Sequence, residues 1–263
     1  MDTTELPGPG DRRAAFYVEV LDRLAAGNIP FLVGGSFAFA RHTNRDRNTK
    51  DLDIFLLPQD VSRALCLFEQ AGCKAQMMFP HWLAKVRRGQ HFVDLIFSSG
   101  NGLARVDNEW FANSTEDEVL GKRVRLCPLE EMIWSKAFVQ ERERFDGTDV
   151  LHLFREGGLT MDWGRLLSRF GEHWPVLLGH IILFRYVYPD CRDRIPAAVV
   201  EELLRRLREQ RNEPENRTCY GTLLSREQFL PDLERFGYVD GRLDLMSADE
   251  IRIWTDAIER PAV

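Results

Sequence analysis

The chain has 263 residues, of which 44% are hydrophobic and 29% charged, so it is long enough to bury a core in one large or two small domains. Its formal net charge of −6 arises in the second part, because residues 1–125 hold 16 basic and 16 acidic side chains. This balance excludes a positively charged coat for non-specific nucleic-acid binding, but it leaves room for a local phosphate site.

The five cysteines are scattered and show no CxxC spacing, which argues against a disulfide framework and a structural zinc site. With a polar start that lacks a secretory apolar run, this favours a reducing, cytoplasmic location. The longest apolar stretch, residues 175–189, is shorter than the roughly 20 residues that span a bilayer. We therefore expect a buried helix there and no membrane association.

Helices and strands alternate along the first hundred residues. Phe16, Val20, Leu21 and Leu24 lie at helical spacing and predict an amphipathic helix over residues 12–26. The elements expected next are a strand at 30–33, a helix after the Gly34-Gly35-Ser36 turn, a strand at 51–57, a helix at 59–71, and strands at 73–79 and 91–98. This order predicts a mixed sheet with helices packed on it.

From Pro128 onward the pattern becomes helical, and proline suits the first position of a helix. Helices are expected at 128–141, 146–156, 162–170, 173–187, 196–210 and 248–259, with a polar loop at 211–217. The predicted fold is thus α+β. A mixed-sheet catalytic core occupies residues 1–125, and an α-helical C-terminal domain over residues 126–263 closes the cleft.

Three aspartates carry the expected chemistry. Asp51 and Asp53 begin an apolar strand and, because strand side chains alternate, they point to the same face. Asp94 stands inside the apolar run 91–97, where a carboxylate is costly to bury unless it is paired or binds a metal. If the two strands are neighbours, the three carboxylates converge and can hold two magnesium ions.

The turn Gly34-Gly35-Ser36 is the candidate phosphate site. Glycine lets backbone amides approach phosphate oxygens closely, and the start of a helix adds partial positive charge. Four basic residues follow within the next loop and suit the tail of a triphosphate, although a solvated loop explains them equally well: Arg41, Arg45, Arg47 and Lys50.

The GGS turn, the hDhDhh pattern at Asp51 and Asp53, and the later Asp94 resemble the DNA-polymerase-β-like nucleotidyltransferase superfamily. Lys136 in the segment SKAFVQERERFDGTDV, followed by Arg144, Asp146 and Asp149, resembles the bacterial abortive-infection and toxin-type members. The resemblance covers residues 30–155.

The resemblance implies two Mg²⁺ ions, with Mn²⁺ as a substitute, and an NTP such as ATP as substrate. Asp51 and Asp53 would hold both ions, while Asp94 would hold the one that activates the acceptor hydroxyl. The nucleotide-binding residues implied are Gly34, Gly35, Ser36, Lys50, Lys136 and Asp149.

Lys136 also stands out in the residue pattern itself. With Leu129, Met132 and Ile133 it falls at helical spacing on an apolar face. A lysine there either extends its amine to water or contacts a buried anion. Asp146 and Asp149 are candidate partners, although either can instead serve as a helix cap or a first-turn acid.

The predicted activity is transfer of a nucleoside monophosphate from an NTP to an acceptor hydroxyl. The acceptor is left open among an RNA 3′ end such as that of tRNA, a protein and a small molecule. A non-catalytic relative that binds nucleotide or a partner, such as half of a toxin–antitoxin-like pair, is the alternative. A phosphohydrolase-like metalloprotein is disfavoured because no histidine–aspartate ligand pair is present.

Overall fold

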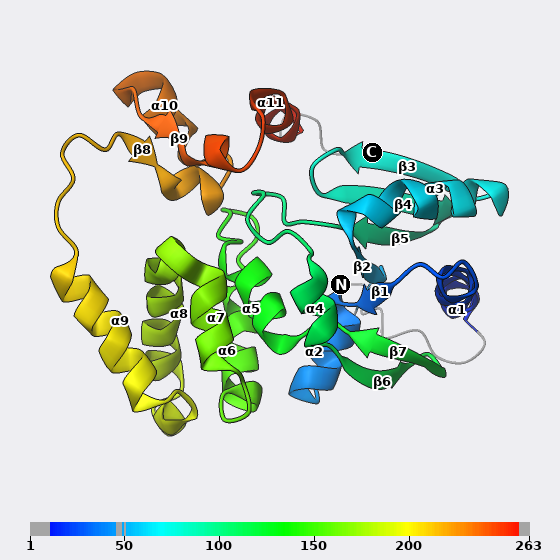
Figure 1. The fold of residues 1–263 in the computed structure, drawn as a ribbon, viewed down its shortest axis with the longest axis horizontal. Coiled ribbons are helices and arrows are strands. Elements are labelled where there is room, and N and C mark those ends of the chain that lie inside the picture. Colours follow the sequence, from blue (N-terminus) through cyan, green and yellow to red (C-terminus); the bar gives the residue numbers. More distant parts are fainter. Residues whose placement is uncertain (1–10, 46–48, 50, 258–263) are drawn as a thin grey trace. The chain divides into compact units, whose positions relative to one another are not determined.

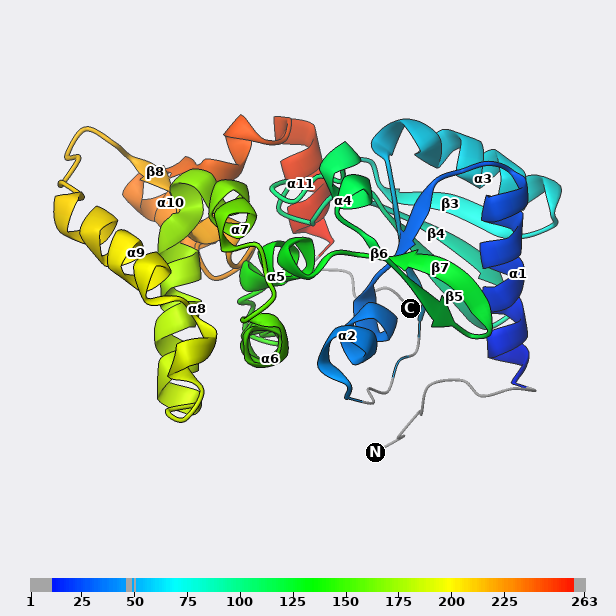
Figure 2. The same cartoon turned by 60° about the horizontal axis from the view of Figure 1, so that its bottom comes forward.

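The structure is a computed structural model that describes residues 11–45, 49 and 51–257. The chain divides into two compact units, Met1–Pro128 and Leu129–Val263. The first unit holds the predicted mixed sheet, and the second holds most of the helices (Figures 1 and 2). The predicted α+β class is therefore confirmed.

The sheet of the first unit has seven strands in the order β3-β4-β5-β2-β1-β7-β6 (Figure 1). The strands are β1 (Phe31–Val33), β2 (Asp53–Leu56), β3 (Lys74–Phe79), β4 (Leu83–Arg88), β5 (His91–Ile96), β6 (Thr115–Val119) and β7 (Lys122–Leu126). The pairs β2–β5 and β1–β7 are parallel, and the others are antiparallel.

The helices of this unit are α1 (Arg12–Ala26), α2 (Gly35–Thr43), α3 (Val61–Gln70) and α4 (Asn108–Ala112). α1 begins where the Asp11 side chain accepts a hydrogen bond from the Arg13 amide, an N-cap that satisfies one unpaired amide of the first turn. β5 alternates from Phe92 to Ile96, with Val93 and Leu95 fully buried, whereas β2 is buried from Ile54 to Leu56. The alternation in β5 leaves its intervening residues on the opposite face of the sheet.

Two features of this unit differ from the sequence prediction. β2 begins at Asp53, so Asp51 lies in a bend before the strand rather than within it. The strands β4, β6 and β7 and the short helix α4 were not predicted. β4, β6 and β7 carry many charged residues, and only one face of each is buried, so hydrophobicity alone does not reveal them.

The second unit contains α5 (Leu129–Ala137), α6 (Gly147–Gly157), α7 (Trp163–Phe170), α8 (Trp174–Val187), α9 (Ala197–Glu209), α10 (Leu230–Phe236) and α11 (Ala248–Asp256). The five helices expected between residues 128 and 210 are all present, although α5 ends four residues earlier than predicted. α10 and a two-stranded pairing of β8 (Thr218–Cys219) with β9 (Val239–Asp240) were not predicted. No helix within the described residues is long and apolar enough to cross a membrane.

Candidate active site

The carboxylates of Asp51, Asp53 and Asp94 converge in the first unit. One oxygen from each lies within 4.8 Å of the others. The parallel pairing of β2 with β5 sets Asp53 directly beside Asp94, and the Asp94 amide donates a hydrogen bond of 3.0 Å to the Leu52 carbonyl. The prediction assumed that the two strands are neighbours, and their pairing in the structure brings the three predicted acids together.

Asp51 is held by Thr49, a residue that sequence reasoning missed. The buried Thr49 hydroxyl lies 2.8 Å from the Asp51 carbonyl and 3.1 Å from its Oδ1. Arg13 of α1 donates a hydrogen bond of 2.9 Å to the Thr49 carbonyl. An Asx-like local bond of this kind positions a carboxylate outside regular structure, so Asp51 does not need to belong to β2.

The glycine turn lies directly against Asp53. The Gly34 amide donates a hydrogen bond of 2.9 Å to the Asp53 carbonyl. Gly35 has a φ of +53°, and a Cβ atom built on it would lie 1.7 Å from Asp53 Oδ2. Only glycine satisfies both conditions. Ser36 stands in the first turn of α2, whose N-cap is Gly34. Backbone amides at a helix start of this kind can bind a phosphate group.

Lys85 of β4 pairs with Asp94 across the sheet. Its Nζ lies 2.9 Å from Asp94 Oδ1 and 3.1 Å from Oδ2, and only the contact with Oδ2 has hydrogen-bond geometry. The Lys85 side chain is only 19% exposed, so it is not part of a solvated face.

Asp94 has the features expected of a metal ligand. Its side chain is 13% exposed, and burial raises the pKa of the carboxyl, against the lowering effect of Lys85. Oδ1 is buried without a hydrogen bond from any described residue. A buried, under-bonded carboxylate oxygen beside two further carboxylates suits a hard divalent cation such as Mg²⁺ or Mn²⁺.

The predicted basic loop is only partly described. Arg41 contacts the Glu118 carbonyl and lies 3.5 Å from Asp117 Oδ1, so β6 already provides acceptors for its guanidinium. Arg47 and Lys50, the latter a predicted nucleotide ligand, lie outside the described residues.

In the second unit Lys136 is paired with the two candidate acids. Its Nζ lies 3.0 Å from Asp146 Oδ2 and 2.7 Å from Asp149 Oδ2. Arg144 holds Asp146 with two further bonds of 2.9 and 2.8 Å. Burial acts to raise the pKa of Asp146, but these cations outweigh it and lower the pKa to about 2. Lys136 therefore contacts a buried anion, as one of the two sequence interpretations held.

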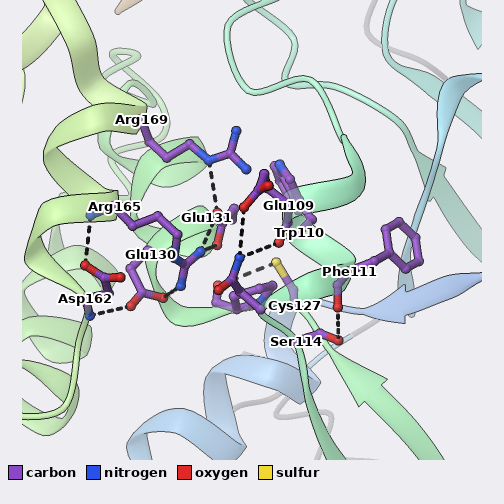
Figure 3. Close-up of polar contacts among 12 residues, drawn as sticks. Glu109, Trp110, Phe111, Ser114, Cys127, Glu130, Glu131, Asp162, Arg165 and Arg169 are labelled. Atoms are coloured by element: carbon purple, nitrogen blue, oxygen red, sulfur yellow. Dashed lines mark hydrogen bonds and ion pairs between the residues drawn. The ribbon is translucent and has the colours of Figure 1, made fainter.

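A second ionic cluster joins α5 to α7 and was not predicted (Figure 3). The Arg165 guanidinium contacts Glu130, and its Nη1 lies 2.6 and 2.5 Å from the two oxygens of the fully buried Glu131. Arg169 donates a third bond to Glu131 at 3.1 Å and stacks over Trp134. Every charged group of the cluster has an ionic partner, although Arg165 Nε is buried without a hydrogen bond from any described residue. The cluster therefore ties the two helices together.

Residues 17–96 match the family model of aminoglycoside-2''-adenylyltransferase, which covers 80 of the 263 residues. No curated protein matches the chain. The matched segment includes the glycine turn and all three aspartates of the acidic cluster.

Among solved structures, the chain is similar to the antibiotic-resistance factor ANT(2'')-Ia in solution. The TM-score is 0.40 and the identity 14%, over 75% of this chain and 98% of that one. It is also similar to the lincomycin-bound lincosamide antibiotic adenylyltransferase LnuA, with a TM-score of 0.39 and 15% identity over 54% and 96%. A putative nucleotidyltransferase from Thermotoga maritima gives a TM-score of 0.35 and 14% identity over 45% and 80%.

Identities and TM-scores this low do not assign a substrate. The family match, over a segment that holds all three aspartates of the acidic cluster, supports a nucleotidyltransferase. Lys136, which indicated the abortive-infection and toxin-type group, lies outside the matched segment, so the match does not test that grouping.

Proposed function

We propose that the protein is a metal-dependent nucleotidyltransferase that moves a nucleoside monophosphate from an NTP to an acceptor hydroxyl. The observation that carries this proposal is the convergence of Asp51, Asp53 and Asp94 within 4.8 Å beside a glycine turn. Asp51 and Asp53 would hold two Mg²⁺ or Mn²⁺ ions, and Asp94 would hold one of them. When bound, such ions neutralise charge on the phosphates and on the attacking and leaving oxygens.

The chain's own residues would position the reactants. Gly34, Gly35 and Ser36 would bind the triphosphate at the start of α2: the amides of Gly35 and Ser36 would donate to it, and Gly34, whose amide is bonded to Asp53, would allow the phosphates to approach the turn closely. Lys50, Lys136 and Asp149 are proposed as further nucleotide-binding residues. Asp94 would lie next to the acceptor hydroxyl and accept its proton as the oxygen attacks the α-phosphorus and pyrophosphate leaves. Positioning and charge neutralisation supply most of the rate in this chemistry.

The proposal specifies the acceptor only as a molecule with a hydroxyl group. The named relatives act on small-molecule antibiotics, an aminoglycoside in one case and a lincosamide in another. For this chain the candidate acceptors are an RNA 3′ end, a protein hydroxyl and a small molecule, and the experiment includes all three.

The purified chain is incubated with Mg²⁺ and each α-labelled NTP, together with total tRNA, cell extract or small hydroxylated molecules. We expect labelled product in at least one mixture and none when EDTA is added. The Asp53→Asn variant should lose this transfer, while its melting temperature without metal holds or rises because one of three clustered negative charges is removed. Full transfer by Asp53→Asn would contradict the proposal.

A further inference from the structure

The face of β3, β4 and β5 that carries Asp94 extends away from the acidic cluster. Residues paired directly across antiparallel strands lie on the same face. The register gives two rows on this face: Gln76, Lys85 and Asp94 in the first, and Lys74, Arg87 and Phe92 in the second. The opposite face is fully buried at Val86 and Val93, so the Asp94 face is the open one.

The open face is strongly basic. The three strands contain a single acidic residue, Asp94, and Lys85 is paired with it. Lys74 and Arg87 are exposed and stand directly opposite each other. Neither forms an ion pair with any residue that the structure describes. Like charges directly opposite in a sheet destabilise it, and the contact of Arg87 with the Phe92 ring offsets this repulsion only in part.

These cations lie within reach of the acidic cluster. The Arg87 guanidinium is 5.7 Å from the Phe92 ring centre, and Lys85 Nζ is 4.5 Å from the same ring. Neighbouring strands are about 4.8 Å apart, so Arg87 is one strand from Asp94 and Lys74 is two. The row of Arg87 is also displaced from Asp94 by two residues, roughly 7 Å along the strand, so a group held by both cations would lie roughly 8–12 Å from Asp94.

The order of strands separates this face from the glycine turn. The turn follows β1, on one side of β2, whereas β5, β4 and β3 extend from the other side. A triphosphate at the turn would therefore leave the β3–β5 face open to the second substrate.

We propose that this face binds the acceptor, and that the acceptor carries a phosphate group near the hydroxyl that receives the nucleotide. The inference rests on the proposed nucleotidyl transfer. Lys74 and Arg87 would pair with the phosphate through charge-assisted hydrogen bonds, which are the stronger class. A polycationic acceptor would meet two exposed positive charges that form no ion pair with any described residue. The acceptor class therefore differs from the aminoglycosides for which the matched family is named.

The test compares the full chain with a Lys74→Gln/Arg87→Gln double variant. Lys122→Gln is the matched control, since Lys122 is a partly exposed cation of β7 that pairs with Asp22 outside this face. Binding of total tRNA and of ribose 5-phosphate is titrated without NTP, and transfer of labelled NMP to each of them and to tobramycin is then measured. We expect the double variant to bind the phosphate-bearing acceptor about tenfold more weakly. NTP affinity and melting temperature should be kept, and Lys122→Gln should match the parent chain.

Binding of tRNA alone would identify a polymer as the phosphate source, and binding of ribose 5-phosphate would identify a small sugar phosphate. The inference is overturned if the parent chain binds neither tRNA nor ribose 5-phosphate, or if the double variant binds them as tightly as the parent chain. It is also overturned if the parent chain labels tobramycin and the double variant labels it to the same extent. Failure of the proposed function has a different signature. In that case no acceptor is labelled and Mg²⁺-dependent NTP binding is absent, whatever the acceptor titrations give.

Discussion

Lys85 places a positive charge against Asp94 where three carboxylates lie within 4.8 Å of one another. Without a metal, this ammonium offsets part of the repulsion within the cluster. With a metal, the ion itself supplies the balancing charge. The lysine and the metal are therefore partly redundant in stabilising the first unit, although they occupy different positions.

Replacing Lys85 with methionine should make stability depend more strongly on metal. We expect the metal-free melting temperature of Lys85→Met to fall by several degrees, since about 1 kcal/mol shifts a unit of this size by roughly 4 °C. Saturating Mg²⁺ should restore most of the loss, so the gain on adding Mg²⁺ exceeds that of the parent chain. Lys122→Met removes a comparable lysine–aspartate pair away from the cluster and should leave the Mg²⁺ gain unchanged. Equal gains in all three proteins would contradict this role.

Gly35 combines a backbone requirement with a packing requirement. Its φ of +53° strains any other residue, and an added Cβ would overlap the Asp53 carboxylate. Gly121 provides the matched control, because its φ is +74° and nothing lies within 4 Å of a Cβ there.

Gly35→Ala should displace Asp53 and abolish transfer, whereas Gly121→Ala should only cost about 1 kcal/mol of unfolding free energy. Measuring Mg²⁺ binding by calorimetry separates the two effects. Transfer activity in Gly35→Ala equal to that in Gly121→Ala would show that the turn does not position the metal site.

At the scale of elements, the ionic cluster between α5 and α7 is a buried polar contact of the second unit. Glu131 is fully buried and depends on Arg165 and Arg169 for its charge partners. Removing one partner of a buried pair leaves an uncompensated charge, which costs more than the intact pair contributes.

Arg165→Met should therefore destabilise the chain by about 3–5 kcal/mol. Combining it with Glu131→Gln should cost less than the sum of the two single changes, because no buried charge is left unpaired. Arg205 makes comparable ion pairs on the surface of α9, and Arg205→Met should change stability little. Urea unfolding of the four variants gives the comparison, and additive costs at Glu131 and Arg165 would refute the coupling.

The sequence predicted the elements whose residue composition is distinctive. The strand holding Asp94 was recognised because it is rich in Phe, Val, Leu and Ile, and helices α6 to α9 because the chain becomes helical in character after Pro128. β4 was missed because Lys85 and Arg87 occupy its open face and interrupt an otherwise buried strand. The sequence of one strand does not show which residues lie opposite it, so the pairing of Lys85 with Asp94 could not be predicted from β4 alone.

The same limit applies to the candidate site. Asp51 and Asp53 were predicted because alternate residues of a strand share one face, and Asp94 because a carboxylate within an apolar strand needs a partner. Lys85 and Thr49 were not, since their contacts depend on strand register and on a local bend. Register is a property of pairing between distant segments, and residue order specifies it only indirectly.

At the scale of the whole molecule, the chain has two units, and each of them contains some of the predicted nucleotide-binding residues. The glycine turn belongs to the first, and Lys136 and Asp149 belong to the second. If both sets bind one triphosphate, nucleotide binding links the stabilities of the two units. If Lys136 only ties α5 to α6 through Asp146 and Asp149, nucleotide acts on the first unit alone.

Lys136→Met should distinguish these cases. The ammonium lies within 3.0 Å of two largely buried carboxylates, so a triphosphate that recruits it must compete with them. We expect the variant to bind a non-hydrolysable NTP more weakly by roughly 1.5–3 kcal/mol, as for the loss of a charge-assisted contact, with Mg²⁺ affinity retained. Arg144→Met loosens the same Asp146 from a more exposed position and should leave NTP affinity unchanged. Calorimetric titration measures the affinities, and hydrogen exchange of the parent chain should show protection of both α2 and α5 on adding Mg²⁺ and nucleotide. Protection confined to α2, with equal affinity in Lys136→Met and the parent, would mean that Lys136 is a structural residue of the helical unit.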